Sequence, residues 1–335
     1  MLLNKKNIVF AVVLLVVLAL LSCFPIHAKE VIIFSGTWNP GQPQVETQNL
    51  FKKLLEDKSN GKFEVRVISG GAMGGAREHL EACRDGELHL LAIGPEATAI
   101  FNPTYDVENI PFVFEDWEHL YAYLDGEPGD IIKQKVMETL NIRILGTQIR
   151  GPRLLTARKP IYSADDLHGI KMRLSETAPL IRIWGAVGAS VVPIAFNELY
   201  SALQTNIVSA QENPIETIYG QKFYEVQDYL METNHILSIS YFEASEKWFS
   251  SLSEDDQKLI VECMDEAIEY GNNLAIDAMD TLKQEMIDEG WLTFIPMSEI
   301  DMESIRKPAL EEINKMVEEG EYNRELFEMA LSLKK

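Results

Sequence analysis

The sequence predicts an α/β protein with two domains. Short β-rich runs alternate with helical patterns along the 335 residues, and this alternation is typical of α/β architectures with largely parallel sheets. The chain is also longer than the roughly 250 to 300 residues at which a single hydrophobic core stops growing. In addition, residues 253–290 carry one unbroken helical pattern that is long enough to reach across two domains.

Residues 1–28 have the layout of a secretory signal peptide. Two lysines precede an uncharged apolar run at 8–21, whose 14 residues are fewer than the roughly 20 that a membrane-spanning helix needs. We expect export to the periplasm with cleavage after Ala28. Residues 20–23 also resemble a lipobox, in which lipidation of Cys23 would anchor the protein, so both processing routes stay open.

Nine shorter elements are predicted in order along the mature chain. The β-rich runs predict strands at residues 30–34, 63–68, 88–93, 143–149 and 171–174. The helical patterns between them predict helices at residues 45–58, 76–84, 131–140 and 177–187. The glycine-rich residues 70–75 lack the Lys and Ser/Thr of a phosphate-binding loop, so we interpret them as a tight turn before a helix.

The long helical pattern has a recognisable start and end. Its apolar residues recur at steps of three and four: Ile260, Cys263, Ala267, Gly271, Leu274, Ala278 and Leu282. Ser253 and Asp256 form a capping box, and Gly290 is a natural stop. About 35 helical residues would span roughly 50 Å, so we expect this helix to brace two lobes. Residues 302–333 are interpreted as a further helical cover.

The sequence shows no motif for enzymatic chemistry. The histidines form no close metal-binding pair, and there is no G-x-S-x-G nucleophile elbow. Cys83 and Cys263 match no metal or redox spacing. We expect a buried thiol at Cys263, on the apolar stripe, with a disulfide as the alternative. We therefore predict a binding protein rather than an enzyme, without cofactor or metal.

The charge distribution is uneven. The chain has 30 basic and 52 acidic residues, a formal charge of −22, which repels phosphate backbones, so we expect no binding to nucleic acid. Residues 143–182 reverse this balance with eight basic and three acidic residues. Charges beyond the Debye length of about 8 Å are largely screened. The arginines of this segment, rather than the net charge, should therefore decide whether an anion binds.

Three arginines of the basic segment lie among apolar or small residues. They are Arg150, Arg153 and Arg173, and each is predicted at a strand end or a junction between strand and loop. Open α/β sheets hold their ligands at such junctions. A guanidinium offers a planar, two-pronged donor that matches a carboxylate. The sequence therefore predicts a site for a carboxylate.

Three motifs follow the first part of this segment: K-x-R at residues 171–173, P-x-x-F at 193–196 and Q-E-N-P at 211–214. Together with their surroundings over residues 166–235, they resemble the signature region of the DctP-like substrate-binding proteins of tripartite ATP-independent periplasmic (TRAP) transporters. The likeness extends from about residue 31 to the C-terminus.

The resemblance implies a fold and a set of site residues. The fold would be a type II-like, two-lobed periplasmic-binding-protein clamshell with the long helix bracing both lobes. The solute carboxylate would pair with Arg173, assisted by Arg153. A hydrogen bond to the carboxylate is implied for Asn213, and packing on the solute for Phe196. The loops after two strands would also line the cleft, through Trp38, Asn39, Gly94 and Glu96.

The same resemblance implies an organisation and a set of partners. Lobe I would comprise residues 29–150 plus 239–278, and lobe II residues 151–238 plus 279–335. We predict a protein, expected to be monomeric, that captures a small organic carboxylate and delivers it to the TRAP membrane subunits. A ligand-sensing receptor for the same solutes is the alternative.

The solute itself stays open at this point. The chain departs from the family pattern at Pro152, at Arg150 and in the loop 94–96. The additional guanidinium of Arg150 favours a second carboxylate and hence a C4-dicarboxylate, whereas the flat face of Trp38 favours a sugar acid.

Overall fold

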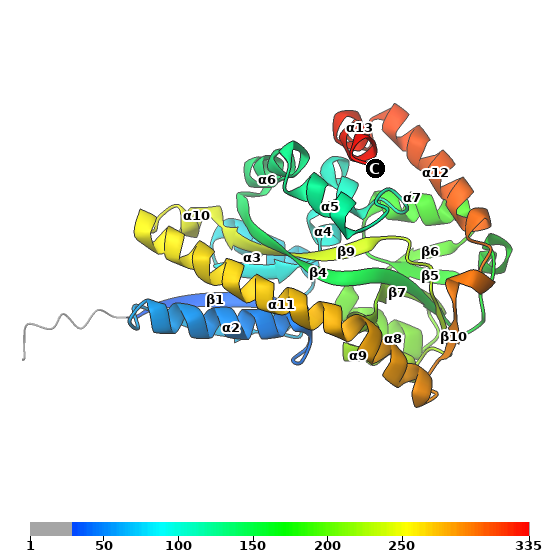
Figure 1. Cartoon of the computed structure of the whole chain (residues 1–335), viewed down its shortest axis with the longest axis horizontal. Helices are drawn as coiled ribbons and strands as arrows, with labels where there is room; N and C mark the ends of the chain where they lie inside the picture. The colour runs from blue at the N-terminus through cyan, green and yellow to red at the C-terminus, as the bar shows by residue number, and fades with distance from the viewer. Residues whose placement is uncertain (1–28, 335) are drawn as a thin grey trace, which may run out of the picture.

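The computed structural model describes residues 29–334, so the predicted signal peptide, with both of its processing sites, lies outside the described residues. In the described part, ten strands form one mixed sheet in the order β2-β1-β3-β9-β4-β7-β5-β6, with β8 attached to β4 and β10 to β8. Helices cover the strands from several sides (Figure 1).

The N-terminal strands form the sheet of the first lobe. β1 (Glu30–Gly36) lies between β2 (Phe63–Ile68) and β3 (Leu90–Ile93), and all three are parallel. The helices that follow these strands are α2 (Pro43–Lys58), α3 (Ala76–Asp85), α4 (Pro95–Thr98), α5 (Trp117–Leu124) and α6 (Glu127–Leu140).

Two long strands connect the lobes. β4 (Ile142–Ala157) pairs antiparallel with β9 (Leu237–Ser245), and the register shifts between Ile149 and Gly151. Gly151 has φ +121°, a conformation that favours glycine at a bulge. Beyond it β4 pairs with β7 and β8. The prediction of largely parallel sheets is therefore wrong for the centre of the sheet, where the strands that cross between the lobes run in opposite directions.

The second lobe continues the sheet from β4. Its strands are β5 (Lys171–Leu174), β6 (Ser190–Pro193), β7 (Ala210–Pro214), β8 (Tyr229–Met231) and β10 (Thr293–Ile295). Its helices are α7 (Ala178–Val187), α8 (Leu199–Gln204) and α9 (Ile215–Gly220). The short α10 (Glu246–Phe249) follows β9 on the side of the first lobe.

The helix α11 (Glu254–Asp288) has 35 residues and braces both lobes, as predicted. The hydroxyl of Ser253 accepts a hydrogen bond from the backbone N of Asp256 at 3.2 Å, which caps the first turn. Near its start Ile260 belongs to the core of the first lobe, and near its end Met286 belongs to a core of the second. Figure 1 shows the helix running diagonally from one lobe to the other.

The C-terminal cover consists of two helices, α12 (Met302–Glu319) and α13 (Arg324–Ser332). Gly320, with φ +78°, ends the first in the left-handed conformation typical of helix ends. α12 packs on α7 and α13 on α6, so the C-terminus touches elements from both halves of the chain.

All nine shorter predicted elements are present, most with ends displaced by a few residues. The largest difference is β4, which continues to Ala157 instead of ending at 149, because the bulge at Gly151 bends the strand without ending it. The strands β6 to β10 were not predicted. Cys83 and Cys263 are buried free thiols. Within residues 29–334 no helix has both the length and the apolar character needed to cross a bilayer.

Candidate functional site

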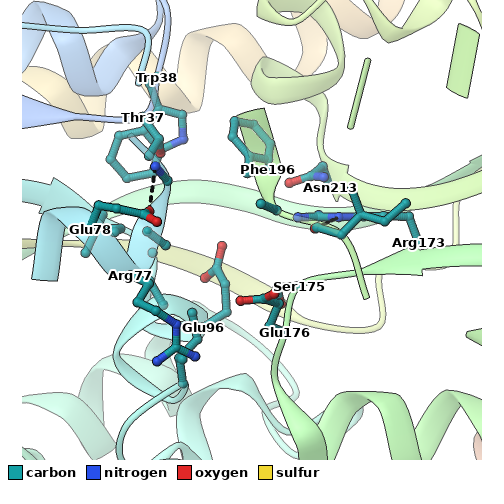
Figure 2. A pocket seen from close by; sticks show the side chains of 18 of the residues that line it. Thr37, Trp38, Arg77, Glu78, Glu96, Arg173, Ser175, Glu176, Phe196 and Asn213 are labelled. Carbon is teal, nitrogen blue, oxygen red and sulfur yellow. Dashed lines mark hydrogen bonds between the residues drawn. The ribbon is translucent and has the colours of Figure 1, made fainter. Parts of the chain in front are cut away.

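A cavity of about 290 Å³ lies between the two lobes. Figure 2 shows Trp38 and Glu96 on one side of it and Phe196 and Arg173 on the other. Its size is close to the lower end of the roughly 300 to 1,000 Å³ typical of small-molecule sites. Eight of the nine residues singled out in the sequence line it. The fold thus brings together side chains from distant parts of the chain.

Arg173 is the buried cation of the second lobe. It lies on β5 between Met172 and Leu174, which point to the opposite face, and its own side chain is only 3% exposed. Nε donates to the backbone O of Ile194 at 2.8 Å. Within residues 29–334 no acid oxygen lies within ion-pair distance of its guanidinium, whereas each of the two neighbouring arginines has such a partner. Arg173 therefore presents an uncompensated positive charge to the cavity.

Burial acts on this charge. It lowers the pKa of Arg173 to about 10, with Glu212 opposing the effect and Arg153 adding to it. The side chain stays protonated at neutral pH. A buried cation without a partner is unfavourable in the empty protein, so an anion that enters the cavity gains more here than it would on the surface.

Arg153 is already paired within the protein. Its Nη2 donates to Oε1 of Glu212 at 2.8 Å, and its Nε to Oε2 of the same carboxylate. His235 donates from Nε2 to that oxygen at 3.0 Å, while its Nδ1 accepts from the hydroxyl of Thr233 at 2.9 Å. Burial alone would raise the pKa of Glu212, but Arg153 and His235 together lower it to about 2. Burial lowers the pKa of His235, so the imidazole is neutral.

Arg150 is enclosed in the same way. It is 1% exposed, and its Nε donates to Glu216 at 3.1 Å and its Nη2 to the hydroxyl of Thr217 at 2.9 Å. Its guanidinium also lies 5.2 Å from the centre of the Trp38 ring. The donors of Arg150 are thus largely used inside the protein.

These placements correct two sequence-based expectations. Arg150 and Arg153 lie in the middle of β4, where the strand crosses between the lobes, and not at a strand end. The suggestion that Arg150 receives a second carboxylate is not supported, because Glu216 already occupies its Nε and Glu96 and Ser238 lie at its Nη1.

Three further predicted residues surround Arg173 and the space in front of it. Phe196 lies with its ring centre 5.8 Å from the guanidinium carbon of Arg173. The amide of Asn213 donates to Gln211 at 2.7 Å and accepts from Arg153 at 3.3 Å, which leaves it one further hydrogen to donate. Trp38 lines the wall opposite, with Arg150 over its ring.

Glu96 enters the cavity from the first turn of α4. Its Oε1 lies 3.4 Å from Nη1 of Arg150 and 3.8 Å from Nη1 of Arg153, and its Oε2 is buried without a hydrogen-bond partner. Gly94 permits this position, because a Cβ there would lie 2.2 Å from Oε2. The hydroxyl of Thr177, from the other lobe, donates to the backbone O of Glu96 at 3.0 Å.

The ninth predicted residue, Asn39, is not among those that line the cavity. Its amide donates to the backbone O of Gly220 at 3.2 Å and to Oε1 of Gln221 at 3.1 Å. Asn39 therefore connects the loop after β1 to α9 of the second lobe.

Several residues of the wall were not predicted from the sequence. Thr37 and Ser175 each follow a strand, and Arg77, Glu78 and Glu176 lie at or next to the start of α3 and α7. Glu78 accepts from the backbone N of Gly75 at 2.9 Å, which closes the helix start (Figure 2). The guanidinium of Arg77 is exposed and lies 4.9 Å from the ring centre of Phe101. Their adjacency to strand ends was the available signal, since loops at strand ends hold ligands in such sheets.

A cavity shared by two lobes that are joined by crossing strands and a bracing helix defines a two-lobed solute-binding protein. In the described residues, no group of three or more His, Cys, Asp or Glu side chains is arranged to hold a metal ion.

Comparison with known proteins identifies the family. The model of DctP, bacterial extracellular solute-binding protein family 7, matches residues 34–320. The solute-binding protein RD1_1052 of Roseobacter denitrificans is 30% identical over 273 residues, which cover 80% of this chain and 83% of that protein. The C4-dicarboxylate-binding periplasmic protein DctP of Rhodobacter capsulatus is 29% identical over 294 residues, 86% and 87% of the two chains. The protein therefore belongs to bacterial extracellular solute-binding protein family 7.

Solved structures agree with this assignment. The TRAP periplasmic solute-binding protein RD1_1052, with bound L-galactonate, superposes with a TM-score of 0.85 at 26% identity, over 91% of this chain and 99% of that one. A TRAP periplasmic solute-binding protein from Shewanella oneidensis, with bound succinate, gives a TM-score of 0.86 at 26% identity, over 92% and 100%. The two-lobed α/β fold predicted from the sequence is thus confirmed.

Proposed function

We propose that this protein captures a small organic acid in the cavity between its lobes and delivers it to TRAP membrane subunits, without making or breaking a bond. The observation that carries the proposal is Arg173. It is a buried guanidinium that faces the cavity and has no acid within ion-pair distance among residues 29–334. A carboxylate of the solute supplies the missing counter-charge and accepts a two-pronged hydrogen bond.

The surrounding residues support this role. Asn213 has one amide hydrogen left for the same carboxylate, and Phe196 provides an apolar contact beside it. Arg153 is paired with Glu212 and donates to the side-chain oxygen of Asn213, so it holds this amide in place without offering a free charge of its own.

The relatives support the class of solute. Similar proteins are named for binding C4-dicarboxylates or 2,3-diketo-L-gulonate, and similar structures hold L-galactonate or succinate. All of these molecules are small organic acids, so a carboxylate is their shared feature.

The lobe boundaries, the monomeric state and the periplasmic location are part of the same proposal. We place lobe I at residues 29–150 plus 239–278 and lobe II at 151–238 plus 279–335, with the division in β4 next to the bulge at Gly151. The mature protein would act as a monomer in the periplasm after export through residues 1–28.

Isothermal titration of the purified chain 29–335 with small organic acids tests the proposal. Replacing Arg173 with Ala should weaken binding by about 2 to 5 kcal/mol, because one partner of a desolvated charge pair is lost. Arg182→Ala is the matched control, since Arg182 belongs to the same basic segment but pairs with Glu312, Glu319 and Glu321 on the surface. A loss of less than tenfold in the Arg173 variant, or an equal loss in the control, would contradict the assigned role.

A further inference from the structure

Glu96 lines the cavity, and its carboxylate is incompletely satisfied by the protein. Its side chain is 20% exposed, and its contacts with Arg150 and Arg153 are long, at 3.4 and 3.8 Å. Its second oxygen, Oε2, has no hydrogen-bond donor within the described residues. A buried acceptor without a donor is costly. Oε2 lies against the backbone of Gly94, so a donor of the solute would strengthen the carboxylate's interactions at Oε1, whose contacts within the protein are long.

The other charges of the wall point in the same direction. Four arginines and three glutamates line the cavity. Two of these arginines, Arg150 and Arg153, are paired with the buried Glu216 and Glu212 behind the wall. Arg77, Glu78 and Glu176 are exposed, so the interior holds three guanidiniums and three carboxylates, and only Arg173 and Glu96 lie outside these two pairs. One acid group can pair with Arg173, but a second would meet the carboxylate of Glu96, because the other two buried guanidiniums are already paired.

The position of Arg77 does not change this balance in the interior. Its guanidinium is exposed and stacks at 4.9 Å on the ring of Phe101, so water screens its charge. The neutral groups of the wall, including Thr37 and Ser175, have hydroxyls that both donate and accept hydrogen bonds. Such groups suit a solute with hydroxyl groups better than one with a second carboxylate.

We propose that Glu96 sets the specificity of the cavity and selects an acid with a single carboxylate and hydrogen-bond donors at its other end, such as a polyhydroxy acid, over a C4-dicarboxylate. This inference rests on the proposed function, because it takes the carboxylate to be held by Arg173. Glu96 accepts the donors of the solute and repels a second acid group. Gly94 is part of the device, since the absence of a Cβ lets the Glu96 carboxylate lie against the backbone.

The test is isothermal titration of the chain 29–335 with four small acids: galactonate, erythronate, succinate and glutamine. The unmodified protein should bind a donor-bearing acid at least tenfold more tightly than succinate. Tightest binding of galactonate or erythronate assigns the donor as hydroxyl, and tightest binding of glutamine assigns it as ammonium or amide. Both results support the role of Glu96, whereas preference for succinate overturns it.

Two variants test the residue itself. Glu96→Gln keeps the shape but removes the charge, and it should reduce the preference for the donor-bearing acid over succinate by about 10- to 100-fold, the range for a hydrogen bond to a charged group. Gly94→Ala keeps the charge but displaces the carboxylate, which lies 2.2 Å from the added Cβ. Gly94 has φ −78°, which Ala adopts freely, so this variant should fold and lose affinity for the donor-bearing acid.

Glu78→Gln is the matched control, because Glu78 also lines the cavity but its carboxylate is bound to the backbone N of Gly75. An unchanged preference in Glu96→Gln, or an equal change in Glu78→Gln, overturns the assignment to Glu96. Failure of all four acids to bind overturns the proposed function and this inference together. Tight binding that survives Arg173→Ala overturns the proposed function, and a preference that still depends on Glu96 in that variant supports the role of Glu96 alone.

Discussion

The pair of Arg153 and Glu212 is the most consequential buried ion pair of the cavity wall, and Glu212→Gln tests it. The glutamine retains the size of the side chain but leaves Arg153, which is 5% exposed, without a counter-charge. Breaking a buried pair from one side costs about 3 to 5 kcal/mol. The lowered pKa of Glu212 gives a similar value for its contribution to the free energy of unfolding. A folded-state pKa of about 2, compared with the ordinary 4.5, corresponds to about 3 kcal/mol.

The sign of the pH dependence follows from the lowered pKa. Glu212 contributes its full stabilisation above about pH 4.5, and this contribution is lost as the pH falls from there toward 2. Urea unfolding of the unmodified protein should therefore show falling stability over that range. Glu212→Gln should be destabilised by about 3 kcal/mol at pH 7 and should lose most of this slope.

The same variant links stability to binding. An acid bound at Arg173 lies close enough to Arg153 to offset part of its unpaired charge, since the two guanidiniums already interact. The thermal stabilisation by bound acid should therefore be larger in Glu212→Gln than in the unmodified protein. Glu266→Gln is the control, because its pair with Lys58 is exposed to solvent and should contribute little to stability. A destabilisation of Glu212→Gln as small as that of the control would refute the reasoning.

Three further outcomes are expected. Arg173→Lys should weaken acid binding in titration by about tenfold or more, because an ammonium cannot reproduce the two-pronged contact; unchanged affinity would argue against that contact. Gly271→Ala should lower the free energy of urea unfolding by about 1 to 3 kcal/mol, since the new Cβ would lie 1.9 Å from Oγ1 of Thr47, whereas Gly185→Ala, with open space around it, should raise it by about 0.5 to 1 kcal/mol. Burial raises the pKa of Glu243 to about 8, so its contribution is greatest below about pH 4.5 and is lost as the pH rises through 8. Glu243→Gln should reduce the loss of stability between pH 5 and 8 by about 1 kcal/mol per pH unit, and an unchanged slope in unfolding curves at those pH values would contradict this.

The parts of the fold that the sequence revealed depend on local signals. The start of α11 is set by Ser253 and Asp256, three residues apart, and its bracing role follows from its length. The continuation of β4 was missed because Gly151 and Pro152 are typical of a chain break. Their role as a bulge depends on pairing with β9, about 90 residues later in the sequence, and no local pattern reports such a pairing.

The site shows the same division. Local context singled out Arg150, Arg153 and Arg173 without ranking them, since all three lie among apolar or small neighbours, and only the family resemblance put Arg173 first. The difference arises from Glu212 and Glu216, which lie four residues apart on β7 and at the start of α9. These two carboxylates reach β4 only because β7 pairs with it in antiparallel register. The tertiary structure thus neutralises two arginines and leaves the third for the solute.

This pairing also explains how a chain with a formal charge of −22 can bind an acid. Surface carboxylates farther than about 8 Å from the cavity are screened by salt, so the nearby groups determine the potential at the solute. Among these groups, each buried pair contributes little net field, whereas Arg173 contributes a full charge in a region with few competing waters. The affinity should therefore change little with ionic strength, while the rate of association, which depends on the long-range field of the whole acidic surface, should rise as salt is added. Stopped-flow measurements of acid binding between 20 and 500 mM salt would separate the effect on affinity from the effect on the association rate. The Debye length changes by about threefold or more over this range. An affinity that falls steeply with salt would show that exposed charges, and not the buried guanidinium, hold the solute.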